Sequence, residues 1–529
     1  MTREMLYDAI TEVRDELIVE AIETTPAKSK LRWLKFGSIA ASFAVVVGLG
    51  AGVLSGKIPW LRIGGNTAGG GADGSMVFDS YAGPVFPLTT VEGGDGLTVE
   101  RAITYDFEGW MAGDFNRRYY GLPVTDSYTL TNPTGEDKTV TLLYPFAADL
   151  FELGLGKRRS TLTADGVELQ TALLAGQYSD LTVGRPGGLP SLHSPDSWEE
   201  YRELLSDGRY QAGALEEWPD LSGVPVTVYE ITNPWAEPGV GNKGDGSYNP
   251  NIHAEMDLNY DKTTVLSYGF NSYCRDPDGG TARLGFNAPQ PPAEGSSKDP
   301  SIYERERAER RYLLVIGEPL DSFRLVGVST GAPESTDYLE WGVDIGADLR
   351  QYETDLDSVL RTVAEQKRRG ADGDADSTED SPDFELYFGM LKDCLLDTGL
   401  FLDDLDARYA FTMLEDLYPD SIQRVFYLKA EVTIPAGASV TVEARMMKEA
   451  SFDYDCSSSK NKGVYGYDLV TKLGTNLEFT AQTVKAVNTD GVEIVRQNFG
   501  FDWENEVDTV TLDPAAEHYY LEVRRIKTK

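Results

Sequence analysis

The sequence predicts a mainly β protein with helical insertions, in which a short cytoplasmic helix and one transmembrane helix precede an extracellular β-sandwich-like ectodomain of two or three units. Three observations support this fold class. Apolar side chains recur at helical spacing in residues 3–23, residues 36–56 carry no charge, and the chain beyond residue 78 alternates apolar and polar residues between turn-forming segments.

These patterns divide the chain into six parts. They are a cytoplasmic amphipathic helix with a basic juxtamembrane segment (1–34), a transmembrane helix (35–57), a Gly-rich tether (58–77), a β-rich domain (78–190), a mixed α/β region with a helical insertion (191–425) and a β-rich C-terminal region (426–529).

The N-terminal arm is predicted to bind a partner through one apolar face. Leu6, Ile10, Val13 and Leu17 lie on this face, and acidic residues lie mostly off it. A helix of about 20 residues cannot bury such a stripe against itself and is only marginally stable alone in water. The partner is a cytoplasmic protein, a second copy of the arm or the bilayer surface; the acidic face disfavours anionic lipid. The alternative is a weakly structured tail.

The next segment is predicted to cross the lipid bilayer. Residues 36–56 comprise 21 residues without a charge, and as a helix they would extend roughly 31 Å, the thickness of a bilayer core. Lys28, Lys30, Arg32 and Lys35 precede the segment, so the positive-inside rule places the N-terminus in the cytoplasm and the remainder outside. A cleaved signal peptide is the alternative, but about 35 residues precede the apolar segment, more than a signal peptide carries there.

One face of this span predicts self-association. Small residues recur every four positions, and such ridges let two helices approach closely in lipid. They are Ala40, Ala44, Gly48, Gly52 and Gly56. A homodimer through the transmembrane helix is one interpretation, and an accident of a Gly- and Ala-rich helix is the other.

Composition excludes several classes of protein. The chain has 48 Lys and Arg against 86 Asp and Glu, a net charge of −38, which would repel nucleic-acid phosphates. Three cysteines without a C-x-x-C pair exclude a disulfide scaffold, a zinc ribbon and a thioredoxin-type centre. We predict no nucleic-acid partner.

The exterior part is predicted to consist of β-hairpins and some helices. Alternating segments flank turn residues at 132–137, 435–438 and 488–491, and further strand-like runs occur at 226–231, 265–268, 312–316 and 323–328. The two β-rich ranges either form separate units or belong to one sandwich interrupted by a long insertion. Helices are expected at 384–396, at 402–417 and along the apolar face that runs from Leu349 and Tyr352 to Val363.

No catalytic residue, metal site or cofactor is predicted. The three histidines, His193, His253 and His518, are far apart without zinc-ligand spacing. Asp372, Asp374 and Asp376 have calcium-loop spacing, but Ser377 stands where the loop needs glycine, so a solvated acidic loop is the default. An anchored hydrolase is therefore the least supported function.

The N-terminus resembles a known kind of protein. Residues 6–10 (LYDAI), 15–18 (DELI) and 33–35 (WLK) are similar to the start of single-pass membrane proteins of Gram-positive bacteria that are regarded as anti-sigma-factor-like regulators. Residues 80–88 and 129–134 are similar to stretches of their ectodomains. The resemblance implies that the arm contacts a sigma factor and that the exterior part senses or gates.

Together these patterns predict a membrane-anchored regulatory or sensory protein. Its cytoplasmic helix would bind a partner, for which the resemblance names a sigma factor, and its exterior β-rich domain would sense or bind. The alternative is a wall-facing binding or adhesion module.

Overall fold

The computed structural model describes residues 83–108, 110, 121–150, 153, 160–178, 217–237, 250–276, 278–289, 291, 300–328, 344–371, 384–409, 412–453 and 463–526. Strands dominate these residues, which confirms the mainly β fold class. The cytoplasmic helix, the transmembrane helix, the tether and the acidic loop at 372–383 lie outside the described residues. Among the helices that are described, none is long and apolar enough to cross a membrane.

Residues 83–178 and 424–526 contribute three sheets to one unit, here called the β body. Its seven-stranded sheet has the order β22 (Thr509–Thr511), β20 (Phe479–Val487), β2 (Thr98–Asp106), β3 (Leu122–Thr131), β17 (Ser439–Lys448), β5 (Thr161–Ala164), β6 (Val167–Glu168). One four-stranded sheet is β1 (Thr89–Glu92), β4 (Lys138–Ala148), β16 (Arg424–Ile434), β7 (Ala172–Tyr178), and the other is β18 (Phe452–Asp453), β19 (Tyr465–Val470), β23 (His518–Arg525), β21 (Val492–Gln497).

The two β-rich ranges of the sequence share these sheets. β4 pairs with β16 over its whole length, β3 pairs with β17, and β2 runs parallel to β20. Of the two arrangements that the sequence left open, the observed one is a single unit interrupted by a long insertion. The described parts of the ranges 78–190 and 426–529 therefore belong to one unit, because two of the three sheets take strands from both ranges.

The three predicted hairpins are wrong. β3 and β4 lie in different sheets, and so do β16 and β17, and β20 and β21. Each turn crosses between sheets, and the first two crossings lie against each other. Asn132 N–H donates to Ala438 O at 2.9 Å, and the Asn132 side-chain amide donates to Ile434 O at 3.1 Å. Strand alternation and turn residues suit such a crossing as well as a hairpin.

The described part of the insertion, residues 217–409, contains a second and smaller sandwich. One sheet has the order β10 (Thr263–Tyr268), β13 (Arg311–Gly317), β8 (Pro225–Ala236), β15 (Ile345–Asp355). The other has the order β11 (Ser272–Asp276), β12 (Thr281–Asn287), β9 (Asn251–Asp257), β14 (Ser322–Val328). The strand-like runs predicted in this region all form strands.

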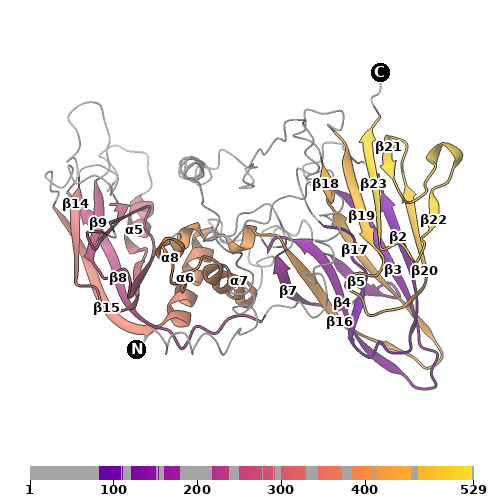
Figure 1. Ribbon diagram of the computed structural model, residues 1–529, viewed down its shortest axis with the longest axis horizontal. Helices are drawn as coiled ribbons and strands as arrows, with labels where there is room; N and C mark the ends of the chain where they lie inside the picture. Colours follow the sequence, from indigo (N-terminus) through magenta and orange to yellow (C-terminus); the bar gives the residue numbers. More distant parts are fainter. Residues whose placement is uncertain are drawn as a thin grey trace, which may run out of the picture.

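Helices lie between the small sandwich and the β body (Figure 1). They are α6 (Leu356–Ala371), α7 (Phe384–Asp397) and the short α8 (Leu405–Arg408), whereas α5 (Pro300–Ala308) lies beside β8. The prediction of a helix at 384–396 is confirmed. Residues Leu386 to Leu395 of α7 are all buried, as expected of a helix enclosed on several sides.

Two other helix predictions need correction. Leu349 and Tyr352 belong to β15, which pairs with β8, and the helix begins only at Leu356. Asp355 fixes this start, since its carboxylate accepts from Ser358 N–H at 2.8 Å. The predicted helix at 402–417 is reduced to α8 and a 3-10 turn, η5 (Leu414–Asp416), because residues 412 and 413 pair with β10 instead.

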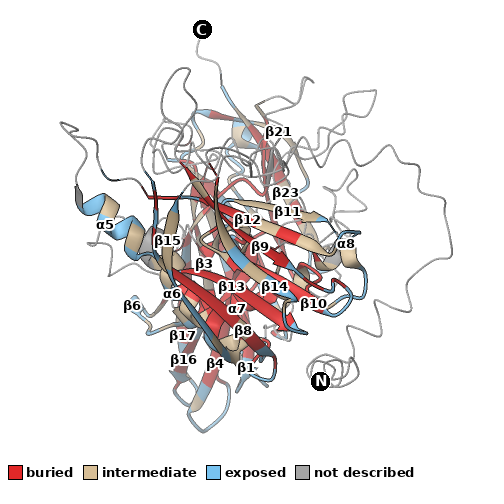
Figure 2. Ribbon diagram, turned by 90° about the vertical axis from the view of Figure 1, so that its left-hand side faces the viewer, coloured by how far each residue is buried: buried red, intermediate tan, exposed pale blue. Residues whose placement is uncertain are grey.

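Two hydrophobic cores hold these parts. One lies between the two sheets of the small sandwich and includes Ile231, Leu284 and Leu313. The other fills the β body and continues through α6 and α7 to the opposite face of the β10–β13–β8–β15 sheet. Viewed from the end that carries the small sandwich, the inner strands β8, β9 and β13 are buried along most of their length, whereas β11, β14 and β15 are mostly intermediate or exposed (Figure 2). The continuous core joins the insertion firmly to the β body.

Candidate functional site

The site residues predicted from the sequence lie outside the described residues. They are Leu6, Ile10, Val13 and Leu17 of the arm and Ala40, Ala44, Gly48, Gly52 and Gly56 of the span.

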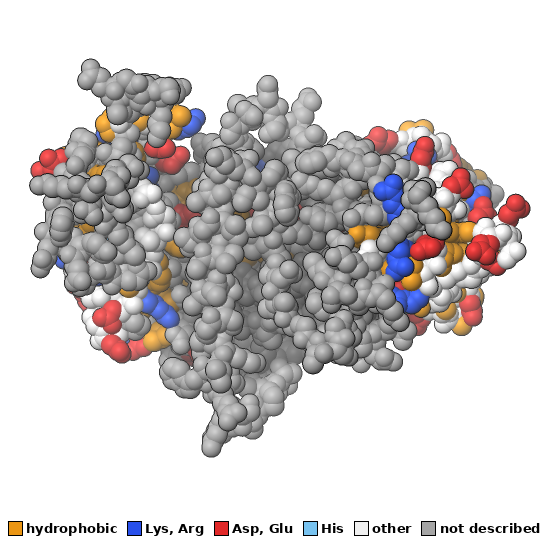
Figure 3. All heavy atoms as spheres, turned by 90° about the horizontal axis from the view of Figure 1, so that it is seen from above, with side chains coloured by type: hydrophobic (Ala, Val, Ile, Leu, Met, Phe, Trp, Pro, Cys, Tyr) orange, Lys and Arg blue, Asp and Glu red, His pale blue; other side chains and the backbone are white. Residues whose placement is uncertain are grey.

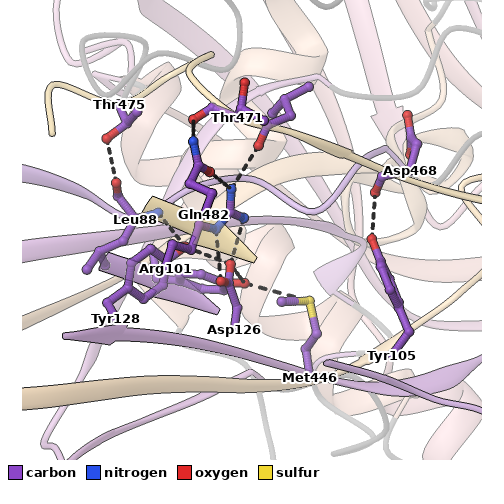
Figure 4. Close-up of polar contacts among 12 residues, drawn as sticks. Leu88, Arg101, Tyr105, Asp126, Tyr128, Met446, Asp468, Thr471, Thr475 and Gln482 are labelled. Atoms are coloured by element: carbon purple, nitrogen blue, oxygen red, sulfur yellow. Dashed lines mark hydrogen bonds and ion pairs between the residues drawn. The ribbon is translucent and has the colours of Figure 1, made fainter. Parts of the chain in front are cut away.

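A buried polar network in the β body centres on Arg101 of β2 (Figure 4). Its guanidinium forms a two-pronged ion pair with Asp126 of β3, at 2.9 and 2.8 Å, and donates to Val470 O at 2.8 Å. Tyr128 donates to Asp126 at 2.6 Å and accepts from Leu88 N–H. Both ion-pair side chains are fully buried. This network links three sheets and offers no opening for a ligand, so it is structural.

One pocket in the β body is too small for a substrate. Pro84, Phe86, Phe146, Ser160 and Met446 are among the residues that line it, and its volume of about 20 Å³ has room for roughly one water molecule.

Among the described residues, Cys394 and His518 are candidates for a nucleophile and a metal ligand, and both are engaged in the interior of the fold. Burial raises the pKa of the Cys394 thiol to about 12, so it is protonated at neutral pH and a weak nucleophile. His518 contacts the buried Asp468 at 2.8 Å, within one sheet. No cluster of His, Cys, Asp and Glu in the described ranges could hold a metal ion.

The face of the β body that is visible in Figure 3 shows no dominant charge. Seen from above in Figure 3, acidic and basic side chains are interspersed at the end formed by the β body. On that face, the described atoms therefore present no extended electrostatic patch that would select a charged ligand.

The most elaborate polar contacts occur where the chain passes between the insertion and the β body. The outgoing crossing is residues 217–224 and the return crossing is residues 412–424. We call their contacts with α6, α7 and β10 the joint.

Arg424 closes one side of the joint. It begins β16, its side chain is 1% exposed, and its guanidinium forms an ion pair with Asp393 of α7. Gly176 O accepts from the same guanidinium at 3.3 Å, and the Tyr178 and Trp218 rings lie 3.8 and 5.7 Å from it. Burial raises the pKa of Tyr178 well above its usual value, so its hydroxyl stays neutral beside the ion pair. The Arg424 guanidinium therefore contacts residues of α7, of β7 and of the outgoing crossing, and links these three segments to β16.

Lys367 of α6 holds the return crossing. Its ammonium donates to three backbone carbonyls, those of Leu414, Glu415 and Leu417, at 2.8, 3.1 and 2.7 Å. Burial lowers the pKa of Lys367. The three carbonyls take up all three donors of the ammonium group, which fixes the 3-10 turn against the helix.

Glu415 fastens the same crossing to the edge strand β10. Its Oε1 accepts from the successive backbone N–H groups of Gly269 and Phe270, the latter at 2.9 Å. Just before them, Ser267 N–H donates to Thr412 O at 2.7 Å. Gly269 has φ +86°, which aims both N–H groups at one acceptor, and a Cβ there would lie 2.5 Å from Arg311 Cγ. Burial raises the pKa of Glu415 to about 8.

Sequence reasoning missed every one of these joint residues. Arg424 and Asp393 are 31 positions apart, and Glu415 and Phe270 are 145 apart. No local spacing reveals such pairs. The only available signal was the concentration of three acidic residues, Glu415, Asp416 and Asp420, in a segment that is otherwise apolar enough to be buried.

Comparison with known proteins adds no identity. Neither a protein-family model nor a curated protein matches this sequence.

Proposed function

We propose that this chain is a membrane-anchored regulatory or sensory protein. The observation that carries the proposal is the order of the sequence: an amphipathic arm, a basic cluster, 21 charge-free residues at 36–56 and then the β-rich part. That order suits a protein that binds a partner in the cytoplasm and exposes a folded domain outside. The joint supports a sensory function, since polar contacts between the insertion and the β body could form in one conformation and break in another.

The cytoplasmic partner is proposed to be a protein, and a sigma factor is the first candidate because of the resemblance of the arm. Leu6, Ile10, Val13 and Leu17 would dock into a groove of that protein. The wall-facing binding module remains the competing function, in which the arm has no partner.

Substituting Ile10 and Val13 by Asp should abolish partner binding. Each buried apolar side chain contributes roughly 1.5–3 kcal/mol, so losing two weakens affinity at least about a hundredfold. A peptide of residues 1–34 should gain helicity, followed by circular dichroism, when the cognate sigma factor is added, and the double variant should not. Glu12→Gln and Glu16→Gln, off the apolar face, form the control. A wild-type arm that binds no cytoplasmic protein and can be deleted without effect on transcription would favour the wall-facing module.

The transmembrane helix is proposed to self-associate through its small residues. Replacing Gly48 and Gly52 together by Leu should weaken association in a membrane two-hybrid assay, because the larger side chains prevent close backbone approach. Val46 and Val53 lie on the other side of the helix, so their replacement by Leu is the matched control. Equal association of both variants would show that the spacing is accidental.

A further inference from the structure

Opening of the joint would bring the buried carboxyl group of Glu415 into contact with water. Its Oε1 accepts two N–H groups from the end of β10, and among the described residues its buried Oε2 has no hydrogen-bond partner. A carboxyl group in this position is solvated only when the return crossing leaves β10. Docking of the crossing and solvation of the carboxyl are therefore mutually exclusive.

We propose that docking of the return crossing onto β10 takes up a proton at Glu415, so that acid strengthens the joint and rising pH weakens it. The proposal rests on the proposed function only in interpreting the joint as part of a sensor. Acidification outside the cell would then favour the state in which the return crossing is docked onto β10.

The direction follows from the two environments of the carboxyl group. Undocked and in water, Glu415 has the ordinary glutamate pKa of about 4.5, whereas burial raises its pKa to about 8 when docked. Between these values the docked state holds one more proton than the undocked state. The docking equilibrium constant then falls about tenfold per pH unit from about 4.5 to about 8, and levels off above.

The neighbouring charges change the size of this pH dependence of docking, but they do not reverse its direction between about pH 4.5 and pH 8. Five charged or titratable groups interact electrostatically with Glu415. They are Lys367 of α6, Asp416 of η5, Tyr268 of β10, Arg311 of β13 and Tyr418. Lys367 interacts electrostatically with Glu415, with Asp416, with Asp420 of η6 (Pro419–Ser421) and with Cys394 of α7. It lowers the pKa of Glu415, but the opposing effect of burial is larger.

Two further carboxyl groups act in the same direction. Burial raises the pKa of both Asp416 and Asp420. Three acidic side chains within six residues of the return crossing therefore hold protons more tightly when the crossing is docked than when it is solvated. Lys367 has the opposite effect on docking, because burial lowers its pKa and the docked lysine releases its proton more readily than a solvated one. This effect is present only at pH values where the docked lysine is deprotonated.

Hydrogen exchange of the full-length chain in detergent, followed by mass spectrometry from pH 5 to pH 9, tests the proposal. Protection factors are measured for the amides of Ser267, Gly269 and Phe270, with exchange rates corrected for their intrinsic pH dependence. We expect protection to fall by at least about tenfold per pH unit up to about pH 8 in the wild type, since Asp416 and Asp420 add to the effect of Glu415. A β13 peptide, Arg311–Gly317, should keep constant protection and serves as the internal control.

Glu415→Gln separates the proton from the shape of the side chain. The amide oxygen still accepts from Gly269 and Phe270 but carries no charge at any pH, so the slope should be reduced to what Asp416 and Asp420 contribute. Glu415→Ala should lower protection at every pH. Flat wild-type protection between pH 5 and pH 8 would overturn the proposal without any variant, and so would an undiminished slope in the Gln variant. Neither outcome affects the binding test of the arm.

Discussion

Substituting Asp126 by Ala should lower the free energy of unfolding of the β body by about 3–5 kcal/mol, because it leaves the Arg101 charge buried without a counterion. Arg101 and Asp126 are both fully buried. The change removes the acceptor of two guanidinium N–H groups and of the Tyr128 hydroxyl, which donates to Asp126 at 2.6 Å. Native-state hydrogen exchange of β2 and β3 against urea would measure the loss.

The matched control for this change is an exposed ion pair on the neighbouring strand. Arg445 and Glu443 of β17 form a contact of 3.0 Å with exposed fractions of 64% and 27%. Removing Glu443 should change the free energy of unfolding by less than about 1 kcal/mol, since water screens and replaces such a pair. If both substitutions had equal effects, Arg101 would have access to water and the network would not be closed.

A second variant distinguishes a buried charge from simple loss of packing. Replacing Arg101 by Met and Asp126 by Leu together removes both charges and keeps most of the volume. Buried ion pairs are often replaced by apolar residues with little loss, so the double variant should be more stable than Asp126→Ala alone.

The sequence was sufficient for the mainly β class and for the positions of ten of the 23 strands that the structure describes. It was not sufficient for their pairing, because alternation reports only that one face of a strand is buried. In β3, the five residues Leu122, Val124, Asp126, Tyr128 and Leu130 are all buried, and this pattern would be identical in a hairpin. β3 pairs with β2 on one side, but its other partner is β17, more than 300 residues away, to which no local pattern points.

Helix prediction failed where tertiary pairing competed with local pattern. Leu349, Tyr352 and Leu356 have the spacing of a helical face, yet the first two lie in β15. Pairing with β8 from Ile345 to Asp355 stabilises the strand. Leu349 remains 49% exposed, so burial of its apolar side chain would favour neither the helix nor the strand strongly. In α7 the apolar residues surround the helix and no sheet edge competes, which explains the correct prediction.

The joint could not be predicted because its chemistry depends on burial. Glu415 resembles any acidic residue in the sequence, and only the backbone of Gly269 and Phe270, brought there by the path of the return crossing, gives it a role. The same holds for Arg424, whose ion pair with Asp393 exists only because α7 packs against β16.

Gly389→Ala in α7 should destabilise the chain by about 1–3 kcal/mol, the range typical of overpacking, although the same change in an exposed helix stabilises by about 1 kcal/mol. The reason for the inverted sign is Trp218 of the outgoing crossing. A Cβ on Gly389 would lie 2.2 Å from an atom of the indole ring, far inside van der Waals contact. The indole would have to move away from the helix, and with it the ring that neighbours Arg424.

A double-mutant cycle with Trp218→Leu tests this explanation. The smaller side chain removes the clash, so Gly389→Ala should be less destabilising, or even stabilising, in that background. Gly223→Ala is the control, because it lies in the same crossing and a Cβ there meets nothing within 4 Å. Thermal unfolding of the full chain gives all four free energies. A stabilising Gly389→Ala with Trp218 present would mean that the indole does not rest on α7. The outgoing crossing would then be free to move independently of Arg424, and the joint would depend on the return crossing alone.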